Sequence, residues 1–242
     1  MSGHSKWKNI MHKKEKTDAQ KAKIFTKIGK EIAIAVKAGG PDPAVNSKLA
    51  ALIAKAKANN VPNDNIERTI KKASSADSAS LEEMRYEGYG PGGVAVIVEA
   101  ATDNTNRTTP EIRSYFSKYK GNLGTTGCVG YMFEDKGVIM ISKEEGYDED
   151  NLMEAALEAG AEDFVSDEDA YIIYTQPSDL ALVATDLENA GFKYVSAEED
   201  KIPSTYVTLT SDDDIKYMNL LIEHLEDNDD VTEVYHNWEN CD

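Results

Sequence analysis

The sequence predicts an α+β protein in which an N-terminal three-helix bundle precedes two ferredoxin-like α/β sandwich domains, one inserted in the other. Three patterns predict this: helical spacing of apolar residues up to about residue 72, alternating strand-like and helical runs after it, and an internal repeat within residues 138–200. With 242 residues and 40% hydrophobic residues, the chain is long enough for two or three packed cores. We expect a basic helical domain at 1–78, a discontinuous domain at 79–135 plus 204–242, and an inserted acidic domain at 136–203.

The bundle is predicted from apolar residues on one helical face. In the first helix they recur every four positions, at Ile24, Ile28, Ile32 and Val36. Gly39 ends this helix, and a second is expected at about 43–59. Pro62 suits the first turn of a third helix that carries Ile66 and Ile70. Residues 2–16 are basic and lack periodicity, so we expect a mobile arm there.

The inserted domain is predicted from two similar βαβ units. The first has a strand at 138–142, a helix near 152–159 and a strand at 163–166, followed by three acidic residues. The second has the same order at 171–175, 180–190 and 194–196, again followed by three acidic residues, 198–200. Two such units in series predict a ferredoxin-like sandwich.

The discontinuous domain is predicted from the segments on either side of the insertion. Residues 94–134 form one βαβ half, which ends in a strand at 129–133. The other half, 205–237, has a strand at 206–209, a helix capped by Ser211 and a strand at 231–235. We therefore expect a second sandwich that the insertion interrupts.

Charge divides the chain in the same place as the pattern does. Residues 1–80 hold 16 Lys and Arg against 7 Asp and Glu, a net of +9, whereas residues 81–242 have a net of −27. Lysines clustered on a helical domain can contact phosphates and release counterions from a nucleic acid. The alternative is a solvated helix face, but few acidic partners lie four residues away. The lysines expected to contact phosphate are Lys6, Lys8, Lys13, Lys14, Lys16, Lys21, Lys23, Lys27 and Lys30.

Two further positions are candidates for this contact. Trp7 lies between two lysines, where it can stack on a base or anchor the arm to the bundle; both interpretations stay open. Arg107 lies at a predicted strand-to-helix junction, in the polar segment 103–110. It can present a guanidinium beside a helix N-terminus to phosphate. Helix capping by Asp103 or Asn104 is the alternative, but capping does not explain Arg107.

Other chemistry has little support in the sequence. No Ser, Cys or His has a recognisable base and orienting partner, so we expect no enzyme, no small-molecule substrate and no cofactor. Cys128 and Cys241 lie far apart, and the acidic run that starts at Asp227 has Thr232 where a calcium loop needs glycine, so we expect no metal. No apolar stretch is long enough to span a membrane and none follows the basic start, so we expect no membrane partner and a cytoplasmic protein.

Five segments resemble the YebC/PmpR family, which includes the mitochondrial translational activator of cytochrome oxidase subunit one. They are SGHSKWKNI with KKEKTDAQKAKIFTKIGKEI, YEGYGPGGVAVIVEAATDNTNRT, GNLGTTGCVGYMF and LEDNDDVTEVYHN, and the likeness spans essentially the whole chain. The sequence departs from the family at Thr105, where arginine is common, and at Cys128, where serine is more usual.

The resemblance implies a three-domain α+β regulator of gene expression without enzymatic activity. Bacterial members are described as DNA-binding transcriptional regulators, whereas other relatives resemble translation factors that act on the ribosome at difficult stretches such as consecutive prolines. The residues that match its central loop, and are implied as nucleic-acid contacts, are Asn106 and Arg107. Those that match its opening motif, and are implied first, are Lys6, Trp7, Lys8, Lys13, Lys14, Lys21 and Lys23.

Two functions therefore stay open: duplex DNA binding, and binding of the ribosome through ribosomal RNA. The bundle shows no cluster of base-reading Arg, Asn or Gln at one helix end, and a lysine face contacts backbone rather than bases. A third function, a small-molecule sensor, has no pocket signature.

Overall fold

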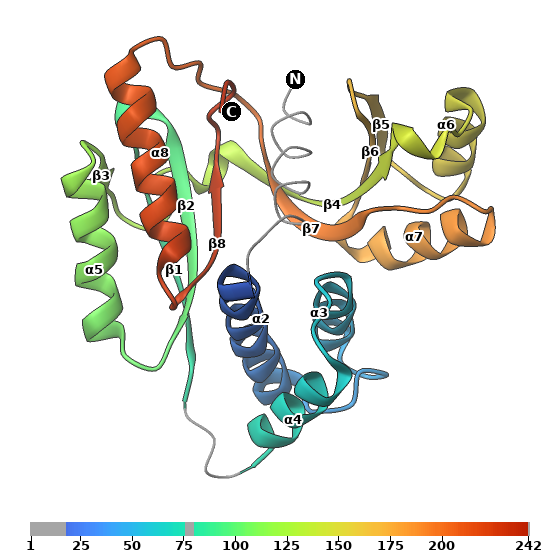
Figure 1. Cartoon of the computed structure of the whole chain (residues 1–242), viewed down its shortest axis with the longest axis horizontal. Helices are drawn as coiled ribbons and strands as arrows, with labels where there is room; N and C mark the ends of the chain where they lie inside the picture. Colours follow the sequence, from blue (N-terminus) through green and yellow to red (C-terminus); the bar gives the residue numbers. More distant parts are fainter. Residues whose placement is uncertain (1–17, 76–79, 242) are drawn as a thin grey trace. The chain divides into compact units, whose positions relative to one another are not determined.

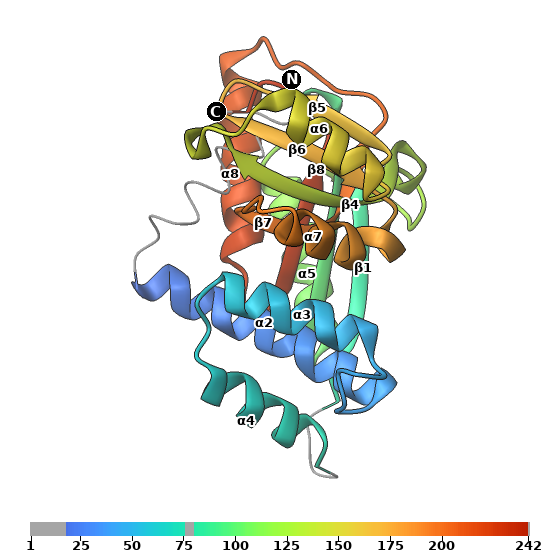
Figure 2. The ribbon, with the colours of Figure 1, turned by 90° about the vertical axis from the view of Figure 1, so that its right-hand side faces the viewer.

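The computed structural model describes residues 18–75 and 80–241 (Figures 1 and 2). Its contacts divide these residues into two compact units. One contains Phe133–Ser204, and the other contains residues 18–132 together with Thr205–Asn240. The predicted arm at 2–16 lies outside the described residues. The described helices include none that is long and apolar enough to cross a membrane.

Three amphipathic helices form the N-terminal bundle: α2 (Asp18–Gly39), α3 (Ser47–Ala58) and α4 (Asn63–Ala73). Their apolar faces meet in one buried cluster that contains Ile28, Ile32, Leu49 and Ile66, as the four-residue spacing predicted. Helix α3 begins at Ser47, four residues later than expected. The reason is Asn46, whose side chain accepts a hydrogen bond from the Leu49 amide and thereby caps the helix.

A four-stranded antiparallel sheet follows, with strand order β3-β1-β2-β8. Its strands are β1 (Glu82–Tyr89), β2 (Ala95–Thr102), β3 (Asn122–Leu123) and β8 (Val231–His236). Helices α5 (Thr105–Lys118) and α8 (Asp212–Asp227) lie side by side against it (Figure 1). Central strand β2 is almost entirely buried, which explains its continuous apolar run.

Two predicted strands of this domain are wrong. Residues 206–209 form no strand: Val207 makes only an isolated bridge to Trp238, and β1 supplies the fourth strand of the sheet. The expected strand at 129–133 is a short 3-10 turn at Gly130–Met132, and the chain enters an extended conformation only at Phe133. Both segments are short apolar runs, for which periodicity does not distinguish a strand from a packed loop.

The other unit is a second four-stranded antiparallel sheet with two helices. Its elements are β4 (Phe133–Ser142), α6 (Glu149–Glu158), β5 (Asp163–Ser166), β6 (Ala170–Thr175), α7 (Leu180–Asn189) and β7 (Ser196–Pro203). The order β5-β6-β4-β7 with this succession is the ferredoxin-like βαββαβ arrangement. Its core is a cluster that includes Ile139, Leu152, Ile173 and Leu187.

The last strand of this unit differs from its prediction. Strand β7 spans 196–203 instead of 194–196, so the acidic residues 198–200 lie within the strand and not after it. β7 pairs only with β4 and is an edge strand, where charged side chains face solvent and oppose pairing with other chains.

The predicted fold class is confirmed: three helices precede two α/β sandwiches, and the second is inserted in the first. Further 3-10 turns lie at Pro91–Gly93, Lys143–Glu145 and Pro177–Asp179. The domain boundaries at 78, 135 and 204 stay a prediction.

Candidate nucleic-acid interface

The predicted phosphate contacts fall into two groups. Lys21, Lys23, Lys27 and Lys30 lie on α2, and Asn106 and Arg107 lie in the first turn of α5. Lys6, Trp7, Lys8, Lys13, Lys14 and Lys16 lie outside the described residues.

The α2 lysines contact a strongly acidic segment that comprises the last two residues of α8 and the three residues before β8. We call residues 226–230, with the sequence EDNDD, the acidic turn. Lys23 Nζ donates to Asp227 Oδ1 at 2.8 Å, and Lys27 Nζ donates to the carbonyl oxygen of Glu226. The Lys23–Asp227 pair is exposed, with 42% and 67% of the two side chains accessible to solvent.

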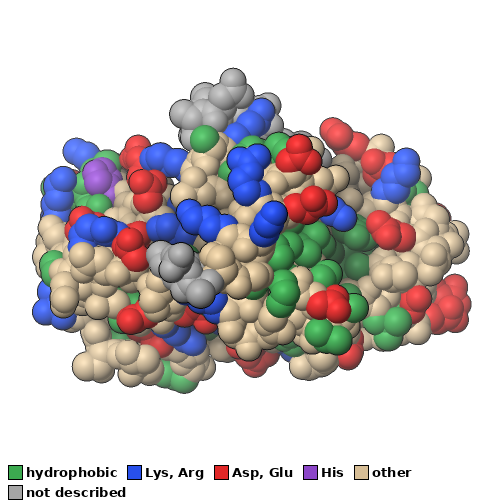
Figure 3. Space-filling model, turned by 90° about the horizontal axis from the view of Figure 1, so that it is seen from below, with side chains coloured by type: hydrophobic (Ala, Val, Ile, Leu, Met, Phe, Trp, Pro, Cys, Tyr) green, Lys and Arg blue, Asp and Glu red, His purple; other side chains and the backbone are tan. Residues whose placement is uncertain are grey.

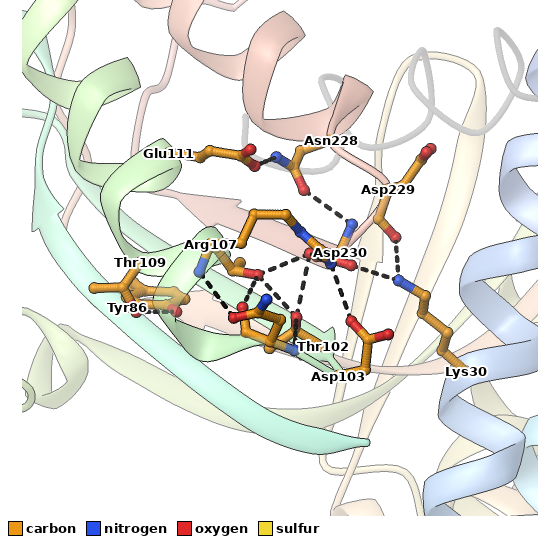
Figure 4. Close-up of polar contacts among 12 residues, drawn as sticks. Lys30, Tyr86, Thr102, Asp103, Arg107, Thr109, Glu111, Asn228, Asp229 and Asp230 are labelled. Carbon is orange, nitrogen blue, oxygen red and sulfur yellow. Dashed lines mark hydrogen bonds and ion pairs between the residues drawn. The ribbon is translucent and has the colours of Figure 1, made fainter. Parts of the chain in front are cut away.

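One helical turn farther along, the contact is less exposed. Lys30 Nζ donates to Asp230 Oδ1 at 2.7 Å and to the carbonyl oxygen of Asp229 at 2.9 Å (Figure 4). The Asp230 side chain is only 7% exposed. Because residues at i, i+4 and i+7 lie on one helical face, Lys23, Lys27 and Lys30 form a single row along the acidic turn.

Asp230 gathers donors from three other parts of the unit (Figure 4). Its Oδ2 atom accepts from Arg107 Nη2 at 2.7 Å, from the Thr108 hydroxyl at 2.7 Å and from the Thr102 hydroxyl at 3.2 Å. Its other oxygen accepts from Lys30. One carboxylate therefore connects α2, the end of β2 and the first turn of α5.

These contacts keep Asp230 ionised. Burial on its own would raise the pKa of this carboxyl, but the hydrogen bonds from Arg107, Lys30 and Thr108 outweigh burial and hold the pKa well below its usual range. Asp227 behaves similarly but less strongly: the Lys23 ammonium lowers the pKa of Asp227, and Asp227 raises that of Lys23.

The structure confirms helix capping in the Arg107 segment and shows which groups the Arg107 side chain binds within the chain. Asn104 caps α5, since its side chain accepts from the Arg107 amide at 3.2 Å. The Arg107 guanidinium bonds to Asp103 and Asp230, and these carboxylates raise its pKa. Asn106 is exposed beside them. Arg107 thus holds carboxylates within the chain, and its use for phosphate stays a prediction.

Several exposed cations escaped the sequence analysis. Arg68, Lys71 and Lys72 lie on one face of α4, and Lys57 lies in the last turn of α3. None of the four makes an ion pair with another residue of 18–75 or 80–241. Figure 3 shows Lys and Arg side chains spread over the face of the molecule seen from below. The signal was available in the sequence, because positions 68, 71 and 72 have helical i, i+3, i+4 spacing.

The aspartates of the acidic turn bind cations of the chain itself. Asp227 and Asp230 bind lysine ammonium groups, as described above. Within the described part of the chain, no group of three or more His, Cys, Asp or Glu residues is placed to hold a metal ion.

Two family models match nearly all of the chain. The TACO1/YebC protein N-terminal domain matches residues 5–76, and the TACO1/YebC second and third domain matches residues 81–238.

Known proteins show the same likeness. The chain is 60% identical over 239 residues to a "Probable transcriptional regulatory protein" of Acetivibrio thermocellus, covering 98% of this chain and 99% of that protein. It is 58% identical to a protein of the same name from Agathobacter rectalis, covering 99% of this chain and all of that protein. The crystal structure of a conserved hypothetical protein from Aquifex aeolicus has 44% identity and a TM-score of 0.83, with 93% of each chain covered. The chain therefore belongs to the TACO1/YebC family.

Proposed function

We propose that this protein regulates gene expression by binding the phosphate backbone of a nucleic acid through its basic N-terminal region. The observation that carries the proposal is the pair Lys23 and Lys27 on one face of α2, whose ammonium groups already bind carboxylate and carbonyl oxygens. The lysines of residues 6–16 extend the same charge toward the N-terminus. The name of the curated relatives, probable transcriptional regulatory protein, agrees with such a role.

The residue types favour contact with the backbone over reading of bases. Lysine offers a flexible point charge, whereas base recognition in the major groove uses arginine, asparagine or glutamine held in bidentate geometry. The α2 side chains that bond to the acidic turn are lysines: Lys23, Lys27 and Lys30. We therefore propose that the target is bound with little direct dependence on base sequence. The name of the relatives favours duplex DNA over RNA as this target.

The proposal is tested by mobility shifts across a salt series. The probes are a promoter duplex, a scrambled duplex and a structured RNA of similar length. If ~5 phosphates are neutralised, log affinity falls with log salt at a slope of about −4 to −5. Binding of the two duplexes with this slope supports the proposal. Binding of the RNA alone would replace DNA by RNA as the target, and absence of binding to all three probes would refute the proposed function.

A further inference from the structure

We propose that Lys23 and Lys27 form a phosphate site on α2 that the acidic turn occupies in the free protein, so that nucleic acid binds there by displacing Glu226 and Asp227 from these lysines. This inference rests on the proposed function and goes beyond it, because it names the ammonium groups that change partner and the segment that leaves.

The contacts resemble those that a phosphate would make. Lys23 donates to a carboxylate oxygen and Lys27 to a carbonyl oxygen, and phosphate oxygens accept the same charge-assisted bonds. The two lysines lie one helical turn apart on the same face of α2, so both can meet one polyanionic strand. The acidic turn is thus an internal ligand of the site.

The turn is held unequally at its two ends. At the Asp227 end the ion pair is exposed on both sides and screened by solvent, so it is weak and readily exchanged. At the other end Asp230 is buried and accepts bonds from Arg107, Thr108 and Thr102 as well as Lys30. Between the two ends, the Asn228 side chain donates to Glu111 Oε2 at 3.0 Å. We therefore expect the Lys23 and Lys27 contacts to open while the Asn228–Glu111 and Lys30–Asp230 contacts persist.

The turn also places negative charge where it opposes a polyanion. Asp229 adds to the negative charge near the Lys23 ammonium, beside Asp227. While these carboxylates remain, the ammonium groups that an approaching phosphate would contact already have acceptors. The negative charge of the carboxylates also repels the phosphate. Removing one of them should therefore strengthen binding rather than weaken it.

The test compares two variants that each remove one exposed carboxylate from a lysine pair. Asp227→Asn frees Lys23, and the matched control Asp213→Asn frees Lys120, whose pair is similarly exposed. Affinity for a duplex of about 20 base pairs is measured by fluorescence anisotropy. An exposed pair of ordinary strength predicts a gain of about two- to fivefold for Asp227→Asn. We expect the control to stay within about 1.5-fold of the parent, and Lys23→Ala to cancel the gain in the double variant.

Hydrogen exchange gives a readout that does not depend on affinity. Saturating duplex should speed exchange of the amides of Glu226 and Asp227 in the parent protein and leave those beside Asp230 protected. Equal affinities of the two variants, or slower exchange at Glu226 and Asp227, would overturn the inference while leaving nucleic-acid binding intact. Failure of every variant to bind any nucleic acid would refute the proposed function and this inference together.

Discussion

Asp230 is the residue on which several separate segments depend. Its carboxylate accepts bonds from Arg107, Thr108, Thr102 and Lys30, which come from three different elements. Sequence analysis singled out Arg107 and Lys30 but assigned both to phosphate. It could not find their partner, because Asp230 lies 123 residues from Arg107 and 200 from Lys30, and no local pattern encodes such a pairing.

Replacing Asp230 tests this role. Asp230→Ala removes the acceptor that two cations and two hydroxyl groups share. We expect it to lower the free energy of unfolding by roughly 2–4 kcal/mol, since its partners are partly exposed and keep other acceptors. Urea unfolding measures the change. Asp227→Asn, at the exposed end of the turn, should cost at most about 1 kcal/mol. Equal losses in the two variants would contradict the distinction between a buried and an exposed pair.

The same carboxylates predict how stability depends on pH. The pKa values of Asp230 and Asp227 are lowered in the folded protein, so the unfolded chain binds more protons in acid. Their contribution to stability is complete above the unfolded value of about 3.9 and is lost as pH falls through the lower folded values. We expect the urea midpoint to fall steeply below about pH 4, and to fall less steeply in Asp230→Asn. Identical profiles for the parent and this variant would count against the account.

At the scale of elements, the sequence predicted the helices and strands that have a periodic or repeated pattern. It missed those whose conformation depends on residues distant in the sequence. The four-residue apolar spacing of α2 and the 30-residue repeat of the inserted unit predicted helices and strands close to their observed bounds. The failures were residues 206–209 and 129–133, short apolar runs that pack as loops, and strand β7, whose charged residues fit an edge that only the sheet order reveals.

The connection between α2 and α3 offers a test at this scale. Buried Asn46 caps α3. Its side-chain amide also donates to the carbonyl oxygens of Ala35 and Gly40, which lie at the C-terminal end of α2. Asn46→Ala removes the cap and leaves these buried groups without a partner, so we expect a loss of about 1–3 kcal/mol in unfolding free energy. Asn46→Asp keeps the cap but not the donors and should lie between the parent and the alanine variant. An unchanged midpoint for Asn46→Ala would contradict this assignment.

At the scale of the whole chain, the formal charge of −18 is an average over two parts of opposite charge. A chain with this net charge repels polyanions on average, yet residues 1–80 carry a net of +9. The structure refines this picture: the α2 lysines already hold the acidic turn, whereas the exposed cations of α4 have no ionic partner among the described residues. Composition predicts that the basic part of the chain binds nucleic acid. Only the three-dimensional contacts indicate that the acidic turn competes with nucleic acid for the α2 lysines.

The central claim is that the basic N-terminal region binds nucleic acid, and reversing its charge tests it most directly. One variant changes Lys13, Lys14, Lys21 and Lys23 to Glu, and its matched control changes four exposed lysines of the acidic part, Lys118, Lys120, Lys193 and Lys216, to Glu. Affinity for one duplex is measured for both across a salt series. We expect the first variant to lose at least about 100-fold in affinity and most of its salt dependence, and the control to lose much less. Comparable affinity of the first variant and the parent, with an unchanged salt slope, would contradict the account.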